Sequence, residues 1–454
     1  MVKLEKLIRF GLYAFIFLLP WQTRLIWQDA FLNGFVWEYG RFSLYGTELL
    51  LWVTMLLYGV WLLRAKKISQ VRWGSLFEKT KEPATMVYWL VVAFTLVAGL
   101  SVTWALNADL AYLRWFTLLE AVAVFSMLLL LRIKLFEVAV VWVGSAIVQA
   151  VFATYQFFTQ YTFANKWLGM AYHDPLLGGS IILQSANERW LRAYGSLPHP
   201  NVLAGFLVIG LLFSIYLAFV AKNRAQRALA AVGVVTITPA LFFSFSRSAW
   251  VGLIVALVLL LLWFSRSAQK TLPTKRVYLQ VLLLVLLIVS VLGSTLSEAL
   301  VTRLRGVEPL EVSSITLRFT FTEQALQVFQ HDPFFGVGIG NYTLGVFQII
   351  NATWPGYYYQ PVHNVYLLVL AELGIIGSIL FFIIIARLLL WAMQSSASIE
   401  KTITSLSLIA ILVMGVFDHF FWSSFFGVMI FWIIVALNVQ QLKAAERLPR
   451  KFFW

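Results

Sequence analysis

The sequence contains no cysteine and few charged residues. The absence of cysteine excludes disulfides, thiolate nucleophiles, cysteine-ligated zinc and iron–sulfur clusters, and it fits either side of a membrane. Only 12% of the 454 residues are charged, whereas about a quarter are charged in a soluble domain. The sequence also has no HExxH motif, no paired acidic motif, no Walker loop and no dinucleotide fingerprint. We therefore expect no metal, no cofactor and no direct use of ATP.

Apolar residues dominate the chain. Hydrophobic residues make up 61% of it, and the mean hydropathy is +0.84. This composition predicts an all-α polytopic membrane protein, with residues 1–454 forming a single transmembrane domain. We expect about twelve transmembrane helices, near residues 7–21, 43–63, 84–104, 111–131, 136–158, 201–221, 228–245, 249–265, 277–297, 363–386, 402–419 and 420–438.

The net charge of +14 does not indicate a nucleic-acid partner. Nucleic-acid-binding proteins concentrate lysine and arginine on one face, whereas here the basic residues separate apolar runs, as the positive-inside rule expects. With the N-terminus inside, 24 of the 34 basic residues fall on the inner side. This bias predicts that both termini are cytoplasmic. The remaining basic residues are Arg24, Arg41, Arg114, Lys166, Arg189, Arg192, Arg247, Arg303, Arg305 and Arg318.

Two predicted outer segments, 159–200 and 298–362, are much longer than a tight connection requires, and long loops are usually functional. The second contains "TLRFTFTEQALQVFQ", in which Leu317, Phe321, Ala325 and Val328 recur at helical spacing. The pattern predicts an amphipathic helix across the outer face that ends before Asp332-Pro333.

Arginine on the outer side is the first candidate for chemistry, because its planar fork of donors matches phosphate oxygens. We assign Arg24, Arg41 and Arg114, near aromatic residues, to lipid headgroups. Arg247 lies in the short turn "FFSFSRSAWVGL" between two spans, which places it at the outer membrane surface, although a headgroup anchor is the simpler alternative. For Arg318 the alternative is a solvated position on the amphipathic helix.

"RAYGSLPHPNVLAGFL" places Arg192, His199 and Asn201 immediately before the sixth span. Pro200 and Asn201 suit a helix start, so helix capping is an alternative role for Asn201. His199, held between two prolines, could also be a solvated loop residue.

His363 is the best candidate for acid–base chemistry, because its imidazole titrates near neutrality and a helix N-terminus favours the neutral form. The same N-terminus attracts an anion such as pyrophosphate. Alternatively, His363 and Asn364 only cap the span. Glu372 lies nine residues further on and on another face, so we favour a structural role for it. Asp418-His419, at the outer end of the eleventh span, is a candidate polar pair near the site.

Three segments together resemble the O-antigen ligase and polymerase superfamily of bacterial membrane glycosyltransferases. They are "FSRSAWVGL" (245–253), "RFTFTEQALQVFQHDPFFGVGIGNY" (318–342) and "HNVYLLVLAELGIIG" (363–377), and "RAYGSLPHPN" is a looser match. Each motif is weak alone, but their order and their placement around one large outer loop are fairly specific.

The resemblance implies a GT-C-like fold in the cytoplasmic membrane with an active site on the outer face. It implies that a glycan is moved from undecaprenyl pyrophosphate to an acceptor hydroxyl, without metal or ATP. By the same resemblance, Arg247 and Arg318 bind pyrophosphate and His363 assists the acceptor hydroxyl. We expect the substrate-binding residues to be Arg192, His199, Asn201, Tyr342 and Asn364.

Two functions within the superfamily and one outside it stay open. A ligase passes the glycan to an acceptor such as lipid A-core, and a polymerase passes it to another lipid-linked repeat. The large outer loop before a single His-Asn motif slightly favours a ligase. Twelve spans with inward termini also describe secondary transporters, but these usually show internal repeats and broken helices at the midplane, whereas the polar groups here gather at the outer side.

Overall fold

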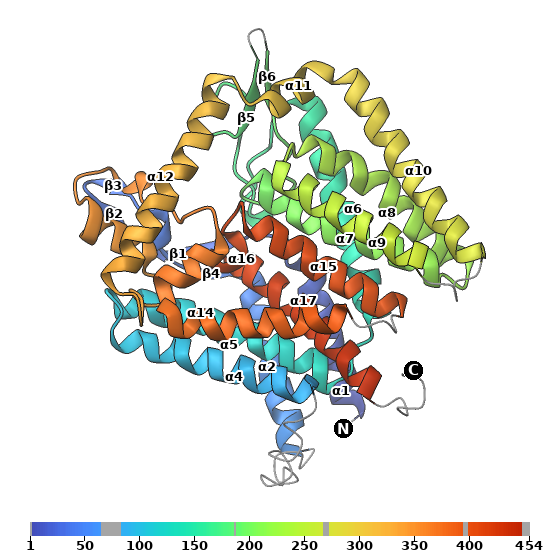
Figure 1. The fold of residues 1–454 in the computed structure, drawn as a ribbon, viewed down its shortest axis with the longest axis horizontal. Coiled ribbons are helices and arrows are strands. Elements are labelled where there is room, and N and C mark those ends of the chain that lie inside the picture. The colour runs from blue at the N-terminus through green and yellow to red at the C-terminus, as the bar shows by residue number, and fades with distance from the viewer. Residues whose placement is uncertain (1, 65–82, 186–187, 267–271, 394–397, 447–454) are drawn as a thin grey trace.

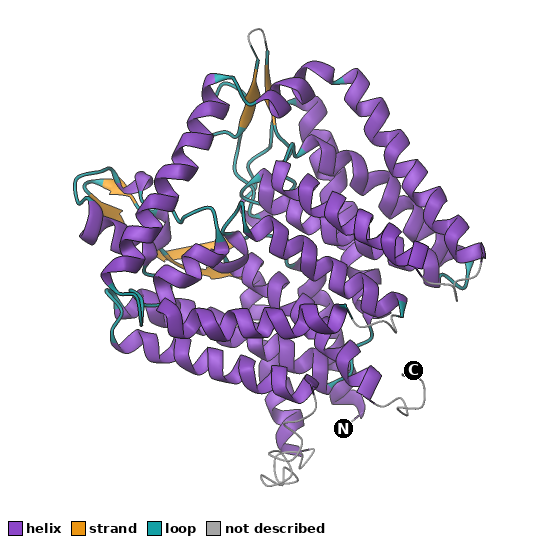
Figure 2. Ribbon diagram, in the orientation of Figure 1, coloured by secondary structure: helices purple, strands orange, loops and turns teal. Residues whose placement is uncertain are grey.

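The computed structural model describes residues 2–64, 83–185, 188–266, 272–393 and 398–446. It is dominated by helices, and the strands within these ranges are short (Figure 2). The long helices are α1 (Val2–Leu18), α2 (Gly46–Arg64), α4 (Pro83–Leu100), α5 (Ala108–Leu130), α6 (Leu135–Thr159), α7 (Pro200–Val220), α8 (Arg224–Phe243), α9 (Arg247–Arg266), α10 (Leu272–Thr295), α14 (Val365–Ala392), α15 (Ile399–Gly415) and α17 (Phe425–Glu446). The all-α polytopic class is confirmed.

Each of these helices coincides with one apolar run of the sequence. Ten of the described helices are long and apolar enough to cross a membrane, whereas α1 and α15 have 17 residues each. The expected total of about twelve therefore includes two shorter helices. The last expected span, 420–438, begins only at Phe425, because Phe420–Ser423 forms a separate short helix, α16.

Several basic residues that the sequence places on the inner side lie outside the described residues. They belong to 65–82, 267–271 and 447–454, and they are Lys66, Lys67, Arg72, Lys79, Lys81, Lys270, Arg447, Arg450 and Lys451. The two ends of the described chain, in α1 and α17, lie at the same side of the bundle (Figure 1).

The centre of the bundle is formed by α7 and α17, each of which is 89% buried over its apolar window, whereas α10 is only 11% buried. Every residue of α7 from Pro200 to Leu217 is buried. A helix that is apolar on all sides is stable only when protein or lipid surrounds it. Because α7 is surrounded by protein, its N-terminus is a rigid platform for the residues that precede it.

The described strands form three two-stranded antiparallel sheets. In the N-terminal region β1 (Arg24–Gln28) pairs with β4 (Phe42–Tyr45), and β2 (Phe31–Leu32) pairs with β3 (Phe35–Val36). In the expected outer segment 159–200, β5 (Ile182–Gln184) pairs with β6 (Arg189–Leu191). The β5–β6 hairpin lies beside α11 at the top of the molecule in Figure 1.

The expected outer segment 298–362 contains α11 (Ser297–Arg305), α12 (Pro309–His331), α13 (Tyr342–Gly345) and a π-helical turn, Val346–Ile350. The amphipathic helix predicted here is α12. It buries Phe321, Ala325 and Val328 and ends just before Asp332, as expected. It starts earlier than "TLRFTF", at Pro309, and Leu317 is 40% exposed instead of facing the core.

The helix α14 is interrupted at Gly374, where the backbone adopts φ 61° and ψ −165°. The loop after α12 fills the break: Val337 N donates to Ala371 O at 3.1 Å, and Ile375 N donates to Pro333 O at 2.9 Å. In a helix that crosses a membrane, every freed backbone group needs such a partner. This pairing fixes the glycine-rich loop 333–340 against α14, close to the N-terminus that carries His363.

Candidate active site

Four arginines from distant parts of the sequence gather at one end of the bundle. We call Arg192, Arg247, Arg303 and Arg318 the arginine cluster. Arg192 follows β6, Arg247 opens α9, Arg303 is on α11 and Arg318 is on α12. The charges of Arg303 and Arg247 contribute to the pKa of Arg192, and the charge of Arg247 contributes to that of Arg318. The cluster is therefore one electrostatic unit.

The turn between α8 and α9 accepts hydrogen bonds from two of these arginines. Phe245 adopts φ 46°, a left-handed conformation that is rare for a bulky residue. Arg192 Nε donates to Ser244 O at 2.7 Å, and Arg303 Nε donates to Phe245 O at 2.8 Å. Arg192 and Arg303 are only 4% and 6% exposed. These two buried guanidiniums thus clamp the turn and position Arg247, which follows it.

Arg247 and Arg318 remain available for a ligand. Arg247 forms one ion pair, from Nη2 to Glu311 Oε2 at 3.0 Å, and its side chain is 28% exposed. Arg318 is half-buried, and its guanidinium makes no hydrogen bond or ion pair within the described part of the chain. Burial lowers the pKa of Arg318, and the charge of Asp418 partly offsets that effect. Both guanidiniums can therefore offer donors to an anion.

Three histidines surround Asp418 next to the arginine cluster. We call His199, His363, His419 and Asp418 the histidine cluster. The rings of His363 and His419 meet edge to face, with centroids 5.1 Å apart. The backbone N of His419 donates to Asp418 Oδ1 at 2.9 Å. Burial raises the pKa of Asp418, but the interactions with His419, His363 and His199 and the hydrogen bond from Asn201 together outweigh burial, so its pKa lies below the usual value.

A hydrogen-bonded chain connects the two clusters. Arg192 Nη2 donates to Asn201 Oδ1 at 2.7 Å, and Asn201 Nδ2 donates to Asp418 Oδ2 at 2.8 Å. Asn201 therefore orients an arginine and an aspartate at once. The capping role considered for Asn201 belongs to His199, whose Nδ1 accepts from Asn201 N at 3.0 Å.

Within the histidine cluster, His363 packs against α12. Its ring is parallel to that of Phe321, with centroids 5.8 Å apart, and its Nδ1 is buried with no hydrogen-bond partner in the described structure. Burial lowers the pKa of His363, the charge of Arg318 lowers it further, and Asp418 opposes them. Its imidazole is therefore neutral at physiological pH and can accept a proton. Burial, with a contribution from Arg192, also lowers the pKa of His199 to about 3.

The cap of α14 is Asn364. Asn364 Oδ1 accepts from Tyr366 N at 2.9 Å and from Leu367 N at 3.0 Å, and Asn364 Nδ2 donates to Val416 O at 3.2 Å. His363 makes none of these bonds. The alternative in which both residues cap the span therefore holds only for Asn364.

A cavity of about 850 Å³ opens beside the histidine cluster, and His199, His363, Asp418 and His419 all line it. Its wall also contains the basic side chains of Arg24, Arg41, Arg114 and Lys166. Arg24 and Arg41 were expected to contact lipid headgroups, but each forms an ion pair with Glu38, at 2.5 and 2.8 Å. The cavity is large enough and polar enough for a small-molecule or glycan ligand.

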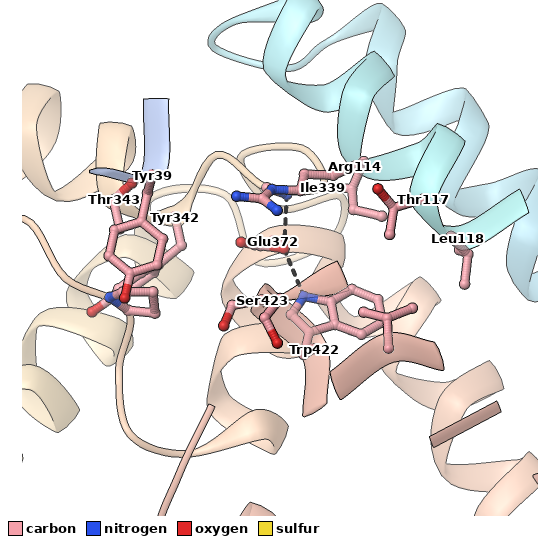
Figure 3. Close-up of a pocket in the computed structure, with 14 residues that line it drawn as sticks. Tyr39, Arg114, Thr117, Leu118, Ile339, Tyr342, Thr343, Glu372, Trp422 and Ser423 are labelled. Atoms are coloured by element: carbon pink, nitrogen blue, oxygen red, sulfur yellow. Dashed lines mark hydrogen bonds between the residues drawn. The ribbon is translucent and has the colours of Figure 1, made fainter. Parts of the chain in front are cut away.

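Tyr342 is placed apart from the cavity. It is fully buried, and its hydroxyl donates to Phe321 O at 3.3 Å. It lines a smaller pocket near Arg114, Glu372 and Trp422 (Figure 3). A substrate contact of Tyr342 therefore stays a prediction from the sequence motif.

Glu372 holds this smaller pocket together. Its Oε2 accepts from Gly340 N at 2.8 Å and from Trp422 Nε1 at 2.8 Å (Figure 3). The carboxylate thus ties α14 to the glycine-rich loop and to α16. The contacts agree with the structural role favoured for Glu372, because this residue supports the elements that flank His363.

Sequence reasoning left Arg303 and Glu311 without a role. Arg303 appeared only among the outer basic residues, and Glu311 was assigned no function. A signal existed in their spacing of eight residues, but the short connection between α11 and α12 had to be known before they could be paired. Among the described residues, no group of three or more His, Asp or Glu side chains has an arrangement that could hold a metal ion.

The fold and the site define a multi-pass membrane protein with a cationic, histidine-containing site at one end of its helical bundle. Residues 232–382 match the sequence model of the O-antigen ligase family. The match covers 151 of the 454 residues, and it shows that this segment is similar to the O-antigen ligase family. No curated protein matches the chain. The matched segment carries Arg247, Arg303, Arg318 and His363, whereas Arg192, His199, Asp418 and His419 lie outside it.

Proposed function

We propose that this protein is an O-antigen ligase-like glycosyltransferase of the bacterial cytoplasmic membrane. It moves a glycan from undecaprenyl pyrophosphate to an acceptor hydroxyl on the outer face, independently of metal and ATP. The observation that carries this proposal is that the charge of Arg318 acts on His363, that the charge of Arg247 acts on Arg318, and that His363 lines the large cavity.

In this reaction the bond between the sugar C1 and the pyrophosphate oxygen breaks. Negative charge develops on the leaving lipid pyrophosphate, and Arg247 and Arg318 stabilise that charge. Fixed cations aimed at developing charge are among the most effective catalytic groups, since they need no reorganisation during the step. Arg192 and Arg303 are positioning residues, because their hydrogen bonds to Ser244 O and Phe245 O hold the turn before Arg247.

His363 is the general base. It takes the proton of the acceptor hydroxyl as that oxygen bonds to the sugar C1. A positioned base contributes about 10²- to 10⁴-fold to such a step. The neutral state of His363 is favoured by burial and by Arg318. The charge of Asp418 instead favours the protonated form of His363, and a hydrogen bond from Asn201 holds Asp418 in place.

The test is reconstitution of the purified protein in vesicles with an undecaprenyl pyrophosphate-linked glycan and a choice of acceptors. Transfer to a lipid A-core-type acceptor supports a ligase. Chain growth on a second lipid-linked repeat supports the second candidate, a polymerase of the same superfamily. If neither acceptor receives glycan while the donor is intact, the proposed activity is wrong.

A further inference from the structure

Glu311 is a buried carboxylate shared between two arginines. Its Oε2 pairs with Arg247 Nη2 at 3.0 Å, and its Oε1 pairs with Arg303 Nη1. Glu311 is 5% exposed. A carboxylate that gives one oxygen to each of two guanidiniums presents the same acceptors as a phosphate group. Glu311 therefore meets the arginines in the way that an anionic ligand would.

The two arginines differ in how firmly they are held. Arg303 is 6% exposed and also donates from Nε to Phe245 O. The Arg247 side chain is 28% exposed, and within the described chain its guanidinium has no hydrogen-bond or ion-pair partner besides Glu311. An incoming anion can therefore reach Arg247, and it competes there with Glu311 alone.

Glu311 also anchors the first half of α12. Between Pro309 and Thr320 it is the one buried residue, while Ser314 and Arg318 are half-buried and the others are exposed. The second half of α12 packs through Phe321, Ala325 and Val328. The contact between Glu311 and Arg247 thus joins the segment that carries Arg318 to the start of α9.

We propose that Glu311 is a positioning residue. It pairs with Arg247 before the donor binds, and the pyrophosphate of the donor then replaces Glu311 as the partner of Arg247. This inference rests on the proposed function. When the donor binds, the carboxylate of Glu311 keeps its ion pair with Arg303, and Arg247 pairs with the donor. A carboxylate close to a pyrophosphate repels it, so Glu311 weakens donor binding. The same competition helps release the product, because the leaving lipid pyrophosphate carries one more negative charge than the donor did.

The experiment is a double-mutant cycle on the full-length protein in vesicles, with a short-chain polyprenyl pyrophosphate as the probe and the corresponding polyprenol as the uncharged control. Glu311→Gln keeps the shape of the side chain and removes its charge. We expect it to tighten probe binding several-fold and to slow release, while polyprenol binding is unchanged. Arg247→Gln should weaken probe binding. In the Arg247→Gln background, Glu311→Gln should tighten binding less than it does in the wild type, because the competition for Arg247 is gone and only the repulsion between carboxylate and pyrophosphate is relieved.

The matched control is Glu308→Gln, which removes a charge one turn earlier from a side chain that caps nothing, and it should leave binding unchanged. Weaker binding in Glu311→Gln, alongside weaker binding in Arg247→Gln, would overturn the exchange and make Glu311 a permanent orienting group. Unchanged binding in Arg247→Gln would instead refute the proposed donor site. If Glu311→Gln fails to fold, Glu311→Asp serves: it is too short to span both arginines and should also tighten binding, and weaker binding would again overturn the proposal.

Discussion

The rings of His363 and His419 lie edge to face with centroids 5.1 Å apart, although 56 positions separate the two residues in the sequence. A hydrogen bond of 2.6 Å joins His419 Nδ1 and Ser423 Oγ, whereas His363 Nδ1 has no hydrogen-bond partner in the described structure. His419 therefore stabilises the local structure, whereas Nδ1 of His363 can accept a proton.

The first prediction concerns His363→Ala. We expect this variant to lose glycan transfer and to keep its thermal stability, because the cap of α14 is Asn364. Transfer rate and Tm, measured on the same purified sample, check both parts. Asn364→Ala is the contrasting variant, and it should lose about 1 kcal/mol of stability with its two capping bonds. Normal transfer by folded His363→Ala would remove His363 from the mechanism.

The second prediction is that Arg247→Lys is nearly as damaging as Arg247→Ala. Lysine keeps the positive charge but loses the planar fork that binds two phosphate oxygens at once. Donor affinity and turnover of the two variants in vesicles provide the comparison. A lysine variant with near-normal values would show that charge alone suffices at this position.

The third prediction is a pH dependence set by His363. Since burial and Arg318 lower its pKa below the usual 6.5, the neutral base persists into mildly acidic solution. The acid limb of the kcat/KM profile should therefore lie below pH 6.5. Arg318→Gln removes a cation that disfavours imidazolium, so it should move the limb upward. Asp418→Asn removes an anion that favours imidazolium, so it should move the limb downward. Shifts in the reverse directions would contradict the assignment of this limb to His363.

The fourth prediction is that transfer persists in excess EDTA and needs no nucleotide. Arginines near the leaving pyrophosphate take the electrostatic role that a divalent ion has in other enzymes. The phosphate-linked sugar of the donor already provides the driving force. The assay is transfer with EDTA, with added magnesium or manganese, and with ATP. Activity that disappears with EDTA and returns with a metal would overturn the mechanism.

The fifth prediction concerns the break in α14. A Cβ on Gly374 would lie 2.3 Å from Phe334 O, and the residue has φ 61°. Gly374→Ala should therefore destabilise the protein by more than about 1 kcal/mol and disturb the loop 333–340 beside the site. Gly59→Ala is the control, since Gly59 lies within α2 with open space at its Cβ, and it should stabilise the protein by about 0.5–1 kcal/mol. Thermal unfolding in detergent measures both.

The sequence by itself determined the helices and the individual candidates within them. Apolar runs of the right length predicted α2, α4 to α10, α14 and α17, because a helix that crosses a bilayer satisfies its backbone hydrogen bonds locally. Arg247 and His363 were also recognisable, since each is a polar residue at the end of an apolar run and belongs to a recognisable motif. These features depend on residues close together in the chain.

Only the tertiary structure decided how the candidates combine. Asn201 reaches Asp418 across 217 positions, and Asn107 N donates to Asn341 Oδ1 across 234. The pairing of Arg24 and Arg41 with Glu38, the sharing of Glu311 and the filling of the α14 break are of the same kind. Charge pairing and hydrogen bonding depend on distance through space, which falls below 4 Å only after the helices have packed. A linear sequence therefore reveals which residues can carry charge or protons, and the packing of the helices selects which of them act together.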